Sequence, residues 1–200
     1  MIKPIAYVYE FKITLAGIRP AIWRMIQAPE KYTFWDLHVA IQDAMGWDDC
    51  HLHAFRMKSP ETGVTETVGI PDEETWKEGS QTIPGWECLM ADWFTSKNAR
   101  AVYQYDFGDS WEHVVELTQI VPAEHDVKYP VCVDGKRACP PEDCGGIWGY
   151  EEFLKAIKRP KHPRHKELLG WIGGHFAPEQ FDPKNVKFDN PEKRWKRAFS

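Results

Sequence analysis

Tyr103–Leu117, which reads YQYDFGDSWEHVVEL, decides the fold expected for this chain. Apart from Asp109, the odd-numbered positions of the stretch are aromatic, aliphatic or histidine, and the even-numbered positions are mostly polar. A period of two is typical of strands that bury one face. Gly108, Asp109 and Ser110 interrupt the alternation with residues that favour turns. The stretch therefore predicts a β-hairpin whose aromatic face packs into a core.

The parity of the aromatic positions also predicts the register of this hairpin. A three-residue loop at Gly108–Ser110 pairs Phe107 with Trp111. The same loop pairs Tyr105 with His113, so that every odd-numbered residue shares one face. A two-residue Gly-Asp loop would put the aromatic side chains on opposite faces. We therefore expect the longer loop, with three polar residues near its tip: Asp106, Asp109 and His113.

A helix is predicted over residues 34–45. Thr33 and Asp36 match a capping box, with Asp in place of the usual Glu. Apolar residues follow at helical spacing, and Gly46 stands where a left-handed C-terminal cap is expected.

Alternating polar and apolar residues predict further strands on both sides of this helix. The expected strands are 7–15, 21–26, 51–57 and a short one at 68–70. With the hairpin of residues 100–121 they predict an α+β fold, in which one helix packs on a mixed sheet in the manner of β-grasp folds.

The chain divides by composition into two parts of one expected structural domain. Residues 1–121 form the sheet body, which an acidic excursion over 58–98 interrupts. Three tryptophans suggest that this excursion packs on the body: Trp76, Trp86 and Trp93. Residues 122–200 form a Cys-rich, short-helical C-terminal extension. Its predicted helices are 150–157 and 165–171, and a polar tail follows them.

Composition favours a cytoplasmic protein without a membrane partner. No apolar run has the length that spans a bilayer, and the N-terminus lacks a signal-peptide core. The formal charge of −5 is uneven, because residues 151–200 carry 12 Lys or Arg against 7 Asp or Glu. This basic part could meet a nucleic acid or the protein's own acidic body. The acidity of the whole chain makes a dedicated nucleic-acid binder the weaker interpretation.

Three of the five cysteines predict a structural zinc site. Cys132, Cys139 and Cys144 lie in a stretch rich in Pro and Gly, and zinc prefers four N or S ligands in a tetrahedron. A fourth ligand would have to come from one of four residues: Cys88, His113, His125 or His165. The alternative is three reduced thiols in a structural loop, since an odd count of cysteines argues against a disulfide framework.

A second group of residues predicts a ligand-binding site. His51 and His53 stand two apart on an expected strand, so their side chains should point the same way. The hairpin tip would add carboxylates and a third imidazole. The binding candidates are therefore His51, His53, Asp106, Asp109, Trp111 and His113, and none is assigned a catalytic role. The alternative is structural, with the aspartates capping the turn and His113 at the edge of the core.

Other motifs exclude some activities. The chain has no phosphate-binding loop, dinucleotide-binding fingerprint, nucleophile elbow or HEXXH zinc motif. Nucleotide-dependent and serine-hydrolase functions therefore lack support. Lys193–Arg197 joins basic residues to a tryptophan that could stack on a base, although a frayed tail explains it equally.

Several strings of residues resemble one family. They are Trp23-Arg24, Leu37-His38, Gly46-Trp47, His51-Leu-His53-x-Phe55, Tyr105-Asp-Phe-Gly-Asp109-x-Trp111-x-His113 and Cys139-Pro-Pro-Glu-Asp-Cys144-Gly-Gly. Together they resemble the plasmid pRiA4b ORF-3-like family, over about residues 5–186. The resemblance implies an association with plasmids and mobile elements, where some members carry a passenger or resolvase (TnpR) label. The chain shows neither the serine-nucleophile domain nor the helix-turn-helix pattern that a serine resolvase needs.

The expected function is a non-catalytic binding or interaction module of plasmids or mobile elements, stabilised by zinc. One alternative is a metal-assisted hydrolase or nuclease at the hairpin tip. The other is nucleic-acid binding through the basic tail at 187–200.

Overall fold

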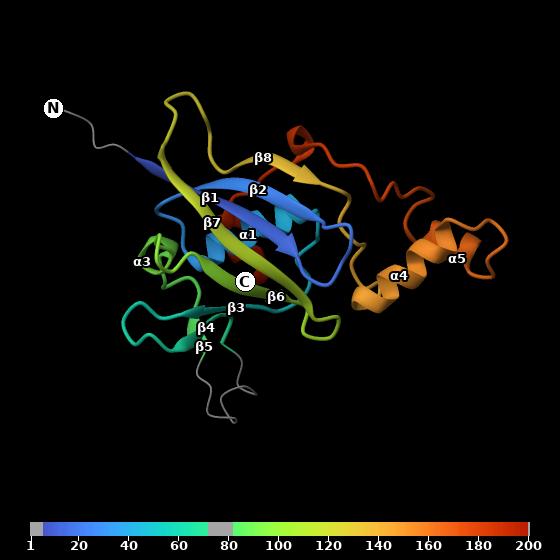
Figure 1. Cartoon of the computed structure of the whole chain (residues 1–200), viewed down its shortest axis with the longest axis horizontal. Coiled ribbons are helices and arrows are strands. Elements are labelled where there is room, and N and C mark those ends of the chain that lie inside the picture. Colours follow the sequence, from blue (N-terminus) through green and yellow to red (C-terminus); the bar gives the residue numbers. More distant parts are fainter. Residues whose placement is uncertain (1–5, 72–81, 200) are drawn as a thin grey trace.

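Eight strands form one mixed sheet in the computed structural model, which describes residues 6–71 and 82–199. The strand order is β5-β4-β3-β6-β7-β1-β2-β8 (Figure 1). Neighbouring strands are antiparallel, except for the parallel pair β4 and β5. The strands are β1 (Tyr7–Leu15), β2 (Trp23–Pro29), β3 (His53–Lys58), β4 (Thr65–Gly69), β5 (Thr82–Pro84), β6 (Arg100–Tyr105), β7 (Trp111–Pro122) and β8 (Val131–Lys136).

Helices cover one face of this sheet and extend beyond its edge. They are α1 (Phe34–Met45), α3 (Met90–Trp93), α4 (Gly146–Ile157), α5 (His165–Trp171), the 3₁₀ helix η1 (Pro183–Asn185) and α6 (Pro191–Ala198). The mixed α+β class is thereby confirmed, whereas the likeness to a β-grasp fold stays an expectation. Among the helices of the described residues, none has the length and hydropathy that a bilayer crossing requires.

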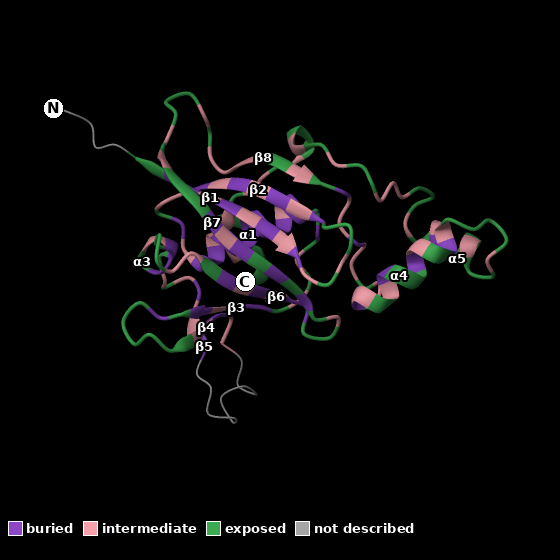
Figure 2. Ribbon diagram, in the orientation of Figure 1, coloured by how far each residue is buried: buried purple, intermediate pink, exposed green. Residues whose placement is uncertain are grey.

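Helix α1 forms as its sequence predicts. The Thr33 side chain accepts a hydrogen bond from the Asp36 backbone N–H, and the Asp36 carboxylate accepts one from the Thr33 N–H. Gly46 closes the helix in the left-handed region, with φ 84°. Behind the sheet, α1 buries Phe34, Leu37 and other side chains against the odd-numbered residues of the central strands, which Figure 2 shows as alternating buried positions.

The central hairpin forms with a different register from the one predicted. Tyr105 pairs with Trp111, and Tyr103 pairs with His113, so the loop spans five residues, 106–110. The predicted pairing was therefore wrong by two residues. The reason lies in Asp106, whose Oδ1 accepts hydrogen bonds from the backbone N–H groups of residues 108 and 109 and so closes a wider loop. The shift by two keeps parity, and only Phe107 leaves the core face.

Three further differences follow from contacts that a single stretch of sequence does not show. Cys132 lies in β8, which pairs with β2, and not in an irregular loop. The strand predicted at 51–57 begins at His53, which leaves His51 in a bend before it. The polar tail contains α6, which packs against α1. Residues 72–81 of the acidic excursion, Trp76 included, lie outside the described residues.

Candidate functional site

Three side chains from distant parts of the sequence meet at the tip of the central hairpin. His51 precedes β3, Asp106 begins the β6–β7 loop, and Asp143 lies in the loop before α4. His51 Nε2 is 3.0 Å from Asp143 Oδ1 and 3.7 Å from Asp106 Oδ2. We call these three residues the His–Asp–Asp set. Within residues 6–71 and 82–199, no other three His, Cys, Asp or Glu residues place their ligand atoms within 4.8 Å of one another.

The backbone around the set explains why the two loops carry aspartate at these positions. Asp106 and Asp143 have φ angles of 54° and 56°. Aspartate tolerates this left-handed region better than most side chains. The Asp109 carboxylate accepts a hydrogen bond of 3.0 Å from the Gly145 backbone N–H. This bond joins the hairpin tip to the loop that supplies Asp143.

The set is open to solvent on one side. The Asp143 side chain is 70% exposed and the His51 side chain 31%, whereas Asp106 is nearly buried at 12%. One imidazole nitrogen and two carboxylates are common ligands of divalent cations, and three protein ligands leave further coordination positions to water or a bound group. The arrangement can therefore hold a cation that remains accessible.

The structure separates the other binding candidates from this set. His53 and His113 are buried in the core, as is Trp111. Burial lowers the pKa of His53 well below its usual value, and it lowers the pKa of His113 to about 3. Both imidazoles are therefore neutral at pH 7. The Asp109 carboxylate accepts the hydrogen bond from Gly145, and it is not one of the three residues whose ligand atoms converge.

The three cysteines of the predicted zinc site do not converge in this way. Burial raises the pKa of Cys132 to about 11 and that of Cys144 to about 12, and it also raises the pKa of Cys139. These thiols are therefore protonated at pH 7 and need a metal to ionise them. The candidate fourth ligands come from different elements: His113 lies in β7 and His165 in α5, whereas Cys88 and His125 lie outside the helices and strands. Zinc binding by the thiols stays a prediction.

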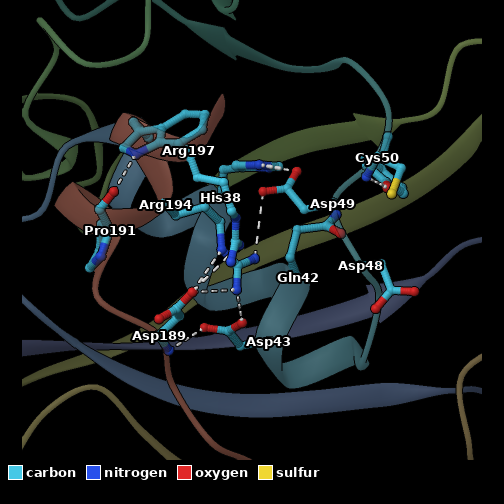
Figure 3. Close-up of polar contacts among 12 residues, drawn as sticks. His38, Gln42, Asp43, Asp48, Asp49, Cys50, Asp189, Pro191, Arg194 and Arg197 are labelled. Carbon is cyan, nitrogen blue, oxygen red and sulfur yellow. Dashed lines mark hydrogen bonds and ion pairs between the residues drawn. The ribbon is translucent and has the colours of Figure 1, made fainter. Parts of the chain in front are cut away.

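A buried polar network links α1 to the C-terminal helix α6 (Figure 3). Arg194 Nη2 lies 2.6 Å from Asp43 Oδ1 and 3.3 Å from Asp189 Oδ2. Its Nη1 faces Asp49 Oδ2 at 3.5 Å, an ion pair rather than a hydrogen bond. The other carboxylate oxygen of Asp49 is 2.8 Å from His38 Nε2.

This network continues into the core through His38. Its Nδ1 is 2.9 Å from the Tyr103 hydroxyl, which also accepts a hydrogen bond from the Gln42 amide. The His38 ring stacks on His53, with ring centroids 3.4 Å apart. Because His38, His53 and Tyr103 are all buried, we interpret the network as a structural link rather than as a binding surface.

Sequence reasoning missed Asp143 and the role of Arg194. Asp143 stands 92 positions from His51. Its only sequence signal is that it belongs to the Cys139–Gly146 string, which carried the family resemblance. Arg194 belongs to the basic tail, whose composition does not distinguish a buried arginine from a solvated one.

The chain is similar over most of its length to a family model, to another protein sequence and to a solved structure. A family model described as plasmid pRiA4b ORF-3-like protein matches residues 7–185. The chain is 36% identical over 196 residues to the uncharacterized protein y4hQ of Sinorhizobium fredii (strain NBRC 101917 / NGR234), with 96% of each chain covered. It is 44% identical to a protein of unknown function, MM3350 from Methanosarcina mazei Go1. That crystal structure has a TM-score of 0.84, with 92% of this chain and 100% of that chain covered.

Proposed function

Because this chain belongs to the plasmid pRiA4b ORF-3-like family, we propose that it is a binding module of plasmids or related mobile elements. The His–Asp–Asp set is its binding site and holds a divalent cation. The convergence of the three ligand atoms within 4.8 Å is the observation that carries this function.

A cation at this position would connect three separate segments of the chain. It would neutralise two carboxylates and hold the loop before α4 against the hairpin tip, where the Asp109–Gly145 hydrogen bond and the His51–Asp143 pair already act. Its remaining coordination positions would face solvent beside Asp143. They suit an anionic group of a partner, such as a carboxylate or a phosphate.

The mixed ligand chemistry favours zinc or manganese over magnesium and calcium. Imidazole suits zinc and other transition metals, whereas magnesium and calcium prefer sites made of oxygen ligands alone. Zinc is therefore the first cation to test, at the His–Asp–Asp set as well as at the three cysteines.

Addition of zinc to metal-free protein should raise the melting temperature if the set binds it. At a free zinc concentration 100 times the Kd, binding stabilises the fold by about 2.7 kcal/mol. For a chain of this length, that corresponds to a shift of about 5–10 °C. Calorimetric titration should give one zinc per chain.

Variants identify which residues bind the ion. His51→Ala and Asp143→Asn should lose the shift, and His162→Ala should keep it. His162 belongs to neither candidate ligand set and accepts a hydrogen bond of 3.3 Å from the Arg164 backbone N–H, and so is a matched control. Loss of binding in Cys139→Ser but not in His51→Ala would place the ion at the thiols and reject the His–Asp–Asp set.

One feature of the set favours a second candidate function, metal-assisted hydrolysis. His51, Asp106 and Asp143 would hold the cation with positions left for water, and the cation would supply the lowered water pKa that hydrolysis of a phosphate ester needs. Zinc- or manganese-dependent cleavage of bis(4-nitrophenyl) phosphate or of plasmid DNA should then disappear in Asp106→Asn. If the metal binds and cleavage is absent in the native protein, the binding module remains.

Nucleic-acid binding through the tail has less support. Arg194 is taken up by the buried network, and Lys196 pairs with Glu192 at 2.7 Å. Lys193 and Arg197 remain as exposed cations of α6.

A further inference from the structure

A cavity of about 610 Å³ lies between α4 and α5, in the part of the molecule that projects beyond the sheet (Figure 1). Its apolar wall is formed by Trp148, Phe153, Leu168 and Trp171. The volume lies within the range of ligand pockets, roughly 300–1,000 Å³. The cavity adjoins the His–Asp–Asp set, because Asp143 contributes to both.

Two tryptophans of this wall are open to solvent. Trp148 is 81% exposed and Trp171 is 48% exposed. Burying an indole is strongly favourable, and tryptophan is among the residues that contribute most to protein interfaces. A small molecule inside the cavity would leave much of Trp148 in water. A segment of a protein partner can cover the ring as well as fill the cavity.

The charges around the cavity favour a cationic occupant. Asp143, Glu152 and Glu167 line it, against a single guanidinium from Arg164. A neighbouring cavity of about 470 Å³ shares Asp143 and Trp171 with it and has two more carboxylates in its lining, Asp48 and Glu142.

The carboxylates already pair with cations of this chain, but the pairs are exposed. Glu167 lies 2.9 Å from Arg164, and Glu152 lies 2.7 Å from Lys155. Exposed ion pairs contribute at most about 1 kcal/mol, so a partner's cation can exchange with them. Hydrogen bonds from these cations lower the pKa of both carboxyl groups, which are ionised at pH 7.

We propose that this cavity receives an arginine side chain from a segment of a protein partner. The guanidinium lies over an exposed indole, Trp148 or Trp171, and its N–H groups reach Glu152 or Glu167. Arginine suits such a site better than lysine, because its planar group stacks on aromatic rings and binds carboxylates through two hydrogen bonds. The proposal does not depend on a bound metal.

A single-stranded nucleic acid fits the cavity less well. The helical pair does carry cations, but Lys158, Arg159, Lys161 and Lys166 do not line the cavity. Phosphates near the two tryptophans would meet the carboxylates of Glu152 and Glu167.

The test is an NMR titration of the full-length protein in the presence of a chelator. The probes are pentapeptides, acetyl-Gly-Gly-X-Gly-Gly-amide, with arginine, lysine, norleucine or glutamate at X. The indole N–H signals of Trp148 and Trp171 are assigned from the Trp148→Phe and Trp171→Phe variants. The arginine peptide should shift both signals, and the norleucine and glutamate peptides should not.

Variants then separate the ring from the charge. Trp148→Ala should weaken binding of the arginine peptide about two- to fivefold or more, as expected for an exposed cation–π contact. The double variant Glu152→Gln/Glu167→Gln should weaken it by a similar factor, whereas Glu151→Gln, one position away and outside the lining, should not. These carboxylates do not belong to the His–Asp–Asp set, so loss of the metal site leaves the result unaffected.

Several results would overturn the proposal. Equal shifts with the norleucine peptide would make the cavity a plain apolar groove. Shifts with an oligothymidylate in place of the arginine peptide would make it a nucleic-acid site. The proposal would also be contradicted if several millimolar arginine peptide left the indole signals unshifted. It would be contradicted as well if Trp148→Ala bound the arginine peptide with unchanged affinity.

Discussion

At the scale of single residues, His113 shows how the core determines the charge of a side chain. The ring is fully buried, near Tyr103, Trp47 and Arg24. Backbone groups of Tyr103 and Trp111 oppose the lowering of its pKa, but neither ring nitrogen has a hydrogen-bond partner among the described residues. Desolvation therefore dominates, and the folded protein holds His113 neutral.

The stability of the fold should depend on this imidazole in acid. The folded pKa of about 3 lies below the unfolded value of about 6.5, so the unfolded chain binds the proton more tightly. The stabilisation is complete above pH 6.5 and falls by up to about 1.4 kcal/mol per pH unit as the pH drops toward 3. In His113→Leu, the loss between pH 6.5 and 5 should be about 1.6 kcal/mol smaller than in the native protein.

Urea unfolding at pH 6.5 and pH 5 measures this difference. His125→Leu is the control, since its side chain is 92% exposed and its removal should leave the pH dependence unchanged. Equal pH dependence in His113→Leu and the native protein would contradict the assignment.

At the scale of elements, the buried Arg194 side chain attaches α6 to α1, although nothing in the sequence of α6 indicates that this arginine is buried. Asp43 and Asp49 have side chains only 7% and 9% exposed, and Arg194 is their common cation. Burial raises the pKa of Asp43, and Arg194 acts against that shift. Around the network, Trp195 packs on Trp35 and on Trp86.

Removal of the Arg194 charge should destabilise the protein strongly. Arg194→Gln leaves buried carboxylates without their cation, which typically costs about 3–5 kcal/mol. Arg197→Gln is the matched control, because its side chain is 67% exposed and lies 3.7 Å from Asp189. Chemical denaturation compares the two, and the second change Asp43→Asn should restore part of the loss. Similar stability of both single variants would mean that α6 is not held by this network.

At the scale of the whole molecule, the C-terminal part of the chain completes structures that begin in the N-terminal part. Strand β8 extends the sheet beside β2, and α6 covers α1. The loop before α4 brings Asp143 to the hairpin tip. The candidate cation site and the α1–α6 network therefore both need segments from the N-terminal and the C-terminal part of the chain.

The sequence by itself determined those features that neighbouring residues specify. The caps of α1 lie within four residues of its ends, and the parity of the central hairpin follows from the alternation of its side chains. Both were predicted correctly because hydrogen bonds and side-chain direction at this range depend on local geometry. His51 and Asp106, two of the predicted binding candidates, lie 3.7 Å apart, and ligand binding by them stays a prediction.

Only the tertiary structure decided the rest. The five-residue loop depends on the hydrogen bonds that the Asp106 carboxylate accepts from backbone N–H groups. The parity of the side chains alone does not distinguish this loop from a three-residue one. His53 and His113 were expected at a binding site, but both side chains point into the core and are buried there. Asp143 joins His51 across 92 positions, and Arg194 joins Asp43 across 151. Contacts at such separations form only when the whole chain packs, so no local pattern encodes them.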